Sequence, residues 1–180
     1  MLNERELVRA MKDAYKCSGY TIAEYDSGGC RKYIIAGPDW LVACDAPMLP
    51  RKALSLVVEH LGTLPHDEAF RVRKDEKPQT VLPDAPVGLF CDFYGKRGAA
   101  LYKTRLVLDG LELWQEQGGN GLMLMKPALT GIAVVTEDWQ AVQSGNALTV
   151  DTGTEFAAIV QVDADHHPGV ERLAQFHWEK

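Results

Sequence analysis

Within its first quarter the chain holds three short strand-like runs joined by links that allow only antiparallel pairing. Tyr20 to Tyr25 alternates between two faces. Cys30 to Ala36 follows the turn signal Ser27-Gly28-Gly29, and Trp40 to Cys44 follows Gly37-Pro38-Asp39. Parallel strands need a crossover of about a dozen residues or more, and these links are far shorter. The segment therefore predicts a three-stranded antiparallel meander.

A helix is predicted on each side of this meander. Asn3 can cap the first helix, with Glu6 placed to complete a capping box, and an apolar stripe follows at helical spacing: Leu7, Val8, Met11, Ala14 and Tyr15. Pro50 suits the first turn of the second helix, whose stripe ends before Gly62: Ala53, Leu54, Val57, Val58 and Leu61. His60 lies off this stripe and is predicted at the surface. Both stripes are expected to cover one face of the sheet.

The second half of the chain is predicted to be mostly β. Asp109-Gly110 is the strongest hairpin signal, because this dipeptide suits a type I′ turn. Further runs are predicted as strands by their apolar content and their flanking turn residues: Val87 to Tyr94, Leu101 to Leu108, Leu122 to Met125, Ile132 to Val135, Ala147 to Val150 and Phe156 to Val162.

These patterns predict an α+β fold. An N-terminal helix–three-stranded antiparallel meander–helix unit occupies residues 1–75, a proline-rich linker or long loop covers 76–86, and a β-rich acidic part follows over 87–180. The sequence leaves open whether the two parts share one core. The helix–meander–helix layout resembles that of secretion chaperones in topology, which by fold-level analogy implies a protein-binding role.

The distribution of charge excludes one class of function. The net charge of −6 arises after residue 77, because the residues up to that point carry twelve basic and twelve acidic side chains. An acidic surface repels phosphate backbones, so we expect no nucleic-acid binding through the second half. An acidic β-rich part suits docking on a basic protein partner.

Location and redox state follow from the same composition. No signal peptide is apparent, and the longest apolar stretch, Leu122 to Val135, is interrupted by Lys126 and Pro127. It is too short to span a bilayer, so we expect a cytoplasmic protein with no membrane partner. The four cysteines show no C-x-x-C spacing and are read as reduced thiols. Cys30 follows two glycines, and Arg31 beside it could lower its pKa.

The densest group of potential metal ligands is Asp163-Ala164-Asp165-His166-His167, with His177 ten residues later. Carboxylates and imidazoles suit manganese, zinc or iron, so Asp163, Asp165, His166 and His177 are the candidate ligands. The Asp-His-His triplet is similar to the motif of the DHH phosphoesterases, but the aspartate motifs which that family carries earlier in the chain are absent. The alternative is a solvated polar connection, because adjacent side chains of an extended segment point to opposite faces.

Four tryptophans divide into two kinds. Trp40 and Trp114 lie in strand-like runs and are predicted in the core, whereas Trp139 and Trp178 are candidate interaction residues, since exposed aromatics anchor protein interfaces. No catalytic motif is present: the chain lacks a G-x-S-x-G elbow and both glycine-rich phosphate motifs. The sequence therefore predicts no catalytic residue and no cofactor.

The preferred hypothesis is a non-enzymatic cytoplasmic protein that binds another protein, as an adaptor, an inhibitor or immunity protein, or a chaperone-like partner. One alternative is a metal-dependent hydrolase that uses the Asp163, Asp165 and His166 cluster, where a bound metal would activate water. A second alternative is a small-molecule binding domain with a pocket between the two halves. Self-association is left open by the sequence.

Overall fold

The computed structural model describes residues 2–96, 98–136 and 140–162. Helix α1 (Glu4–Lys16) begins where the sequence predicts it, because the Asn3 side chain accepts a hydrogen bond from the Glu6 backbone N–H at 3.4 Å. Leu7, Met11 and Ala14 of the predicted stripe are buried. The first helix is therefore confirmed together with its cap.

The predicted meander is confirmed by three antiparallel strands, β1 (Tyr20–Ser27), β2 (Cys30–Ala36) and β3 (Trp40–Asp45). Gly28 and Gly29 form the first turn with φ of 63° and 86°. This left-handed backbone carries no steric penalty in glycine and gives a turn whose twist matches the strands.

Helix α2 (Arg51–Leu61) follows a short 3-10 turn, η1 (Ala46–Met48), and ends at Gly62, as predicted. Its buried face differs from the predicted stripe, because Leu56 is buried while Val58 is 42% exposed. The prediction that His60 lies free at the surface is wrong. Its ring stacks on Tyr15 of α1 at 3.7 Å, and its Nδ1 lies 3.0 Å from the Tyr20 hydroxyl. Helix α2 thus packs against α1 as well as against the sheet.

The next segment corrects one strand assignment. After β4 (Ala69–Val72) and β5 (Gln79–Val81) the chain forms helix α3 (Asp84–Tyr94), where the sequence predicts a strand from Val87. Residues 76–86, the predicted linker or loop, contain β5 and the start of this helix. Pro86 and Phe90 are buried and Phe93 packs beside them, which is helical spacing within a run that is apolar enough to resemble a strand.

The second half is built from short strands, as predicted: β6 (Ala100–Leu108), β7 (Leu111–Glu116), β8 (Leu122–Met125), β9 (Ala141–Ser144), β10 (Ala147–Asp151) and β11 (Glu155–Val160), with the four-residue helix α4 (Pro127–Thr130) after β8. Asp109 and Gly110 form the predicted hairpin turn with φ of 49° and 80°. The strand predicted at 132–135 is wrong, since only Ala133 there makes a bridge. Strand β9 was not predicted from the sequence.

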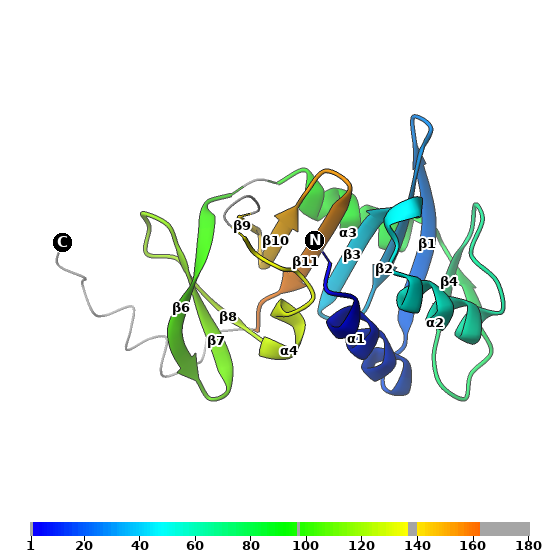
Figure 1. Cartoon of the computed structure of the whole chain (residues 1–180), viewed down its shortest axis with the longest axis horizontal. Coiled ribbons are helices and arrows are strands. Elements are labelled where there is room, and N and C mark those ends of the chain that lie inside the picture. Colours follow the sequence, from blue (N-terminus) through cyan, green and yellow to red (C-terminus); the bar gives the residue numbers. More distant parts are fainter. Residues whose placement is uncertain (1, 97, 137–139, 163–180) are drawn as a thin grey trace.

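The eleven strands of the described residues form one antiparallel sheet in the order β5-β4-β1-β2-β3-β11-β10-β9-β6-β7-β8 (Figure 1). Strand β11 follows the other ten in the sequence but lies in the middle of the sheet beside β3, where Glu155 pairs with Cys44 and Ile159 with Trp40. This one pairing joins the N-terminal meander to the β-rich second half.

Helices cover both faces of the sheet. Figure 1 shows α1 and α2 in front of the first strands and α3 behind them. The larger core lies under α1 and α2 and includes Trp40 and Trp114, both buried as predicted, so residues of both halves pack in it. The smaller core lies under α3 around Phe90 and Phe156. The fold is α+β.

Among the described residues no helix is long and apolar enough to span a membrane.

The far end of the sheet curls back on itself. The backbone N–H of Val162, just beyond β11, donates a hydrogen bond to the Leu124 carbonyl of the edge strand β8 at 2.8 Å. Strands β6, β7 and β8 form the lobe at the left of Figure 1, and one face of it contributes Leu101, Trp114, Met123 and Met125 to the larger core.

The His60 contacts give a pH-dependent prediction. Burial lowers the pKa of His60, the charge of Lys12 lowers it further, and Glu59 opposes both. A folded pKa below the ordinary value means that the stabilisation is present above about pH 6.5 and is lost as the pH falls. His60→Phe retains an aromatic ring that cannot be protonated. In urea unfolding, we expect wild type to lose stability relative to this variant between about pH 7.5 and 5.5. Parallel pH profiles would contradict the assignment.

Candidate functional site

The residues that the sequence selects as candidate sites lie outside the described part of the chain. Asp163, Asp165, His166, His177 and Trp178 follow Val162, and Trp139 lies in the gap at residues 137–139. The metal-site and tryptophan-anchor hypotheses therefore remain predictions. The described residues offer three other places where polar or apolar side chains converge.

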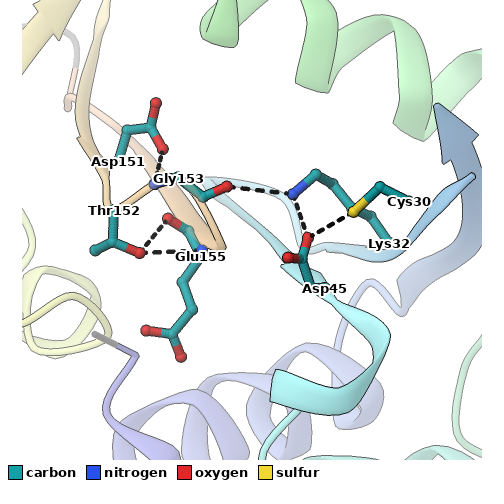
Figure 2. A network of polar contacts seen from close by, with 7 residues as sticks. All are labelled: Cys30, Lys32, Asp45, Asp151, Thr152, Gly153 and Glu155. Carbon is teal, nitrogen blue, oxygen red and sulfur yellow. Dashed lines mark hydrogen bonds and ion pairs between the residues drawn. The ribbon is translucent and has the colours of Figure 1, made fainter. Parts of the chain in front are cut away.

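The first place surrounds Cys30 (Figure 2). The Cys30 thiol lies 3.4 Å from Asp45 Oδ1, and the Lys32 ammonium donates to the same oxygen at 2.5 Å. The hydrogen bond to Asp45 is the main cause that raises the pKa of the Cys30 thiol. The idea that Arg31 lowers this pKa is wrong, since Arg31 instead forms an ion pair with Glu24 at 2.8 Å. Arg31 points to the opposite face of the strand from Cys30, as neighbouring side chains of a strand do. Cys30 therefore lacks the lowered thiol pKa of an activated nucleophile.

The same network connects strands β2 and β3 to the turn before β11, and so links the two halves of the sheet. Lys32 reaches the Gly153 carbonyl at 3.5 Å, and the Asp45 backbone N–H donates to the Thr154 carbonyl at 2.9 Å. Figure 2 shows the turn between β10 and β11 facing Lys32, with Thr152 bonded to the backbone of Glu155. These contacts reinforce the β3–β11 pairing, so their role is structural.

The second place brings together the three side chains most able to hold a metal within the described ranges. One ligand atom from each of Glu24, His66 and Asp67 lies within 4.8 Å of the others. The Glu24 carboxylate is already engaged, because it accepts hydrogen bonds from His66 Nδ1 at 2.8 Å and from the Asp67 N–H at 3.2 Å. Arg31 Nε lies 2.8 Å from the other carboxylate oxygen, a contact of charges without the direction of a hydrogen bond. A cation would have to compete with Arg31, so the group is an ion cluster at the protein surface around the buried Glu24 carboxylate.

The third place is an apolar hollow on the lobe formed by β6, β7 and β8. Its volume is about 620 Å³, within the range of roughly 300–1,000 Å³ typical of ligand sites. The lining residues come from all three strands: Tyr102, Lys103, Thr104, Arg105, Leu106, Leu113, Gln115 and Leu122. Three of these residues are leucines, and the Tyr102 hydroxyl donates a hydrogen bond to Gln115 Oε1 at 2.5 Å. The hollow can accept apolar side chains and offers polar groups at its edge.

A bulge in β6 shapes this hollow. Lys103 pairs with Trp114 and Val107 with Glu112, so Thr104, Arg105 and Leu106 together oppose Leu113 alone. The Thr104 hydroxyl donates to the Leu113 carbonyl at 2.8 Å and accepts from the Leu106 N–H at 3.1 Å. One side chain thus replaces the ladder hydrogen bonds lost at the bulge, and it turns Arg105 and Leu106 toward the hollow.

The outer edge of β6 is open beside the hollow. Strand β9 pairs with Ala100 and Leu101 only, so in the parts of the chain that the structure describes no strand pairs with this edge from Tyr102 to Leu108. Leu106 and Val107 are 42% and 61% exposed on it. The edge strand β5, at one end of the sheet, is only three residues long and lies between Pro78 and Pro83, which cannot donate to a ladder. The edge of β5 is therefore better protected than the unpaired part of β6, which lies between β9 and β7 in the strand order.

The charge beside the hollow is basic, in contrast to the acidic half around it. Lys103 pairs with Glu112 at 2.6 Å, whereas Arg105 forms no ion pair with any residue that the structure describes. The acidic character of the second half is therefore not shared by this surface, because a net charge averaged over about a hundred residues does not locate individual side chains. The expected docking of the acidic half on a basic partner stays a prediction.

Comparison with known proteins adds no precedent for this surface. No protein-family model matches the chain, and no curated protein or solved structure matches it. The function therefore has to follow from the chemistry of the surface itself.

Sequence reasoning missed the open edge and the hollow. One signal was present: Leu106, Val107 and Leu108 are consecutive apolar residues in a strand that leads to an exposed hairpin. In a strand with one solvated face, alternation is the norm, so an unbroken apolar run indicates that both faces meet apolar groups.

Thr104 provides a test of the bulge. Thr104→Val keeps the side-chain shape but leaves the Leu113 carbonyl and the Leu106 N–H without their partner. We expect a loss of about 1 kcal/mol in the free energy of unfolding and faster hydrogen exchange at Leu106. Thr80→Val, at an exposed position of β5, is the matched control and should change neither. Equal effects of the two substitutions would argue against the role given to Thr104.

The ion cluster gives a second pH prediction, opposite in sign to that for His60. The hydrogen bond to Glu24 is the main cause that raises the pKa of His66, with Asp67 adding to it. A raised folded pKa contributes stability that is complete below about pH 6.5 and is lost as the pH rises. Relative to His66→Gln, wild type should gain stability as the pH falls from about 8 to 6 in the same urea assay. A gain on raising the pH would refute the pairing.

Proposed function

We propose that the protein acts by binding another protein, without catalysis, through the hollow and the open β6 edge. The observation that carries this proposal is the unpaired backbone of β6 beside exposed Leu106 and Val107. An open strand edge with apolar side chains is a template for pairing with another chain, and natural sheets normally protect it. The edge strand β5, which is short and flanked by prolines, is protected in that way.

The protein-binding class also fits what the described residues lack. Cys30 has a raised thiol pKa, and the carboxylates of Glu24 and Asp45 are committed to ion pairs. The Tyr20 hydroxyl is hydrogen-bonded to His60 Nδ1, but burial raises the pKa of this hydroxyl, which disfavours a role as a nucleophile. The hollow offers shape and apolar contact, which are the features that recognition requires.

A second candidate function is supported by the volume of the hollow. Space of about 620 Å³ with the Tyr102 hydroxyl and the Gln115 amide at its rim also suits a small apolar molecule with one polar group. Thermal-shift screening separates the two candidates. A small molecule that raises the melting temperature of wild type but not of Leu106→Lys would favour this second function.

The test of the first proposal is a binding comparison between two matched variants. Leu106→Lys places a charge in the hollow, and Leu82→Lys introduces the same charge at a more exposed position beside β5, where Leu82 is 78% exposed. A partner recovered with wild type from native lysate is purified and titrated against each variant. An apolar contact at the centre of an interface contributes about 2 kcal/mol or more, so Leu106→Lys should weaken binding by roughly tenfold or more. Leu82→Lys should leave it unchanged. An equal loss in both variants would place the interface elsewhere.

A further inference from the structure

The geometry of β6 also restricts what kind of segment can bind there, provided that the proposed function holds. The open edge from Tyr102 to Leu108 presents backbone N–H and C=O groups over roughly 20 Å, at about 3.3 Å per residue. An extended segment of a partner satisfies such groups by adding a strand. A partner helix cannot, because its backbone groups are already bonded to one another.

The bulge limits how much of this edge can pair. Three residues of β6 lie opposite one residue of β7 at the bulge, so the backbone spacing from Thr104 to Leu106 is irregular. A partner strand therefore pairs with the residues on either side of the bulge rather than along an unbroken ladder. Long, regular strands are therefore disfavoured. This constraint favours a short segment with a defined register over indiscriminate strand pairing.

The hollow determines the side chain that such a segment presents. Successive residues of an added strand alternate between the two faces of the sheet, so every second side chain is directed toward the side on which the hollow lies. Tyr102, Leu106 and Leu113 meet it there. The matching side chain is large and apolar.

Arg105 determines the charge of the segment. It lines the hollow and is exposed, and its guanidinium lacks an ion-pair partner among the described residues. Guanidinium groups bind carboxylates through paired, charge-assisted hydrogen bonds. Elsewhere the second half is acidic and repels carboxylates, so this part of the lobe is the favourable place for them.

We propose that the β6 edge binds an extended, acidic segment of a partner protein as an added strand, with an apolar side chain in the hollow and a carboxylate on Arg105. The segment is recognised by its backbone, by one or two apolar side chains and by its negative charge.

The test is selection of peptides by the full chain. A display library of random peptides of roughly nine residues, long enough to cover the edge, is selected on immobilised wild type, on Arg105→Glu and on Arg51→Glu. Arg51 is exposed at the start of α2 and serves as the matched control. Wild type and Arg51→Glu should enrich peptides that combine alternating apolar residues with aspartate or glutamate. Arg105→Glu should enrich lysine and arginine instead.

Strand addition is tested on the tightest peptide. N-methylation of alternate backbone nitrogens removes donors without changing side chains, and it should weaken binding tenfold or more in fluorescence anisotropy. Methylation that leaves affinity unchanged overturns the added strand, and so does enrichment of helical spacing. Basic peptides on wild type, or the same peptides on Arg105→Glu, overturn the acidic partner.

Two further outcomes concern other occupants. If sedimentation velocity shows a wild-type dimer that Arg105→Glu dissociates, the occupant is a second copy and the proposal fails. It also fails if a synthetic peptide of residues 163–180 displaces every selected peptide, because the occupant is then part of the chain itself.

The failure of this inference can be told apart from the failure of the proposed function. If selected peptides lose binding to Leu106→Lys but bind Arg105→Glu as tightly as wild type, the proposed function stands and only this inference is overturned. If no peptide binds at all and Leu106→Lys leaves the partner titration unchanged, both fail.

Discussion

The architecture depends on the pairing of β3 with β11. Five residue pairs, from Glu155 with Cys44 to Ile159 with Trp40, join two sets of strands that would otherwise form separate sheets. Ile159, Ala158 and Val42 are almost completely buried there, so the pairing brings apolar contact on both faces together with its hydrogen bonds. The ion pair between Lys32 and Asp45 secures the adjacent turn. Everything on the β6–β8 lobe, including the proposed interface, is positioned through this pairing.

Local signals predicted the first part of the fold well. The Asn3 cap, the glycine turn at Gly28 and Gly29 and the Asp109-Gly110 hairpin each act over a few residues, so their effect can be read directly from the sequence. The errors occurred where packing decides. The run from Val87 to Tyr94 is apolar enough for a strand and became a helix because one side of it covers Phe156 and its neighbours. His60 was assigned to the surface because Tyr15 and Tyr20, its contacts, come from elements more than thirty residues away.

The candidate site was less predictable for the same reason. Whether an edge is open depends on which strands pair, and β6 is left open because β9 pairs with only its first two residues. No property of residues 100–108 alone contains that information. The bulge also depends on a contact between two strands, because the Thr104 hydroxyl donates a hydrogen bond to the Leu113 carbonyl on β7. The apolar run at Leu106 to Leu108 could have drawn attention to the region, but it could not have shown a hollow.

The position of β11 has a consequence for how the chain is made. During synthesis β1, β2 and β3 emerge early and can pair at once, since their links are short. The strand that pairs with the open edge of β3 is β11, which emerges more than a hundred residues later. Until then the edge of β3 is unpaired, and Leu41, Val42 and Ala43, which are buried in the folded protein, are exposed on it. Such edges are where nascent chains aggregate or exchange strands, and closing a loop this long makes folding slow. The nascent chain is therefore expected to be most prone to aggregation before β11 has emerged.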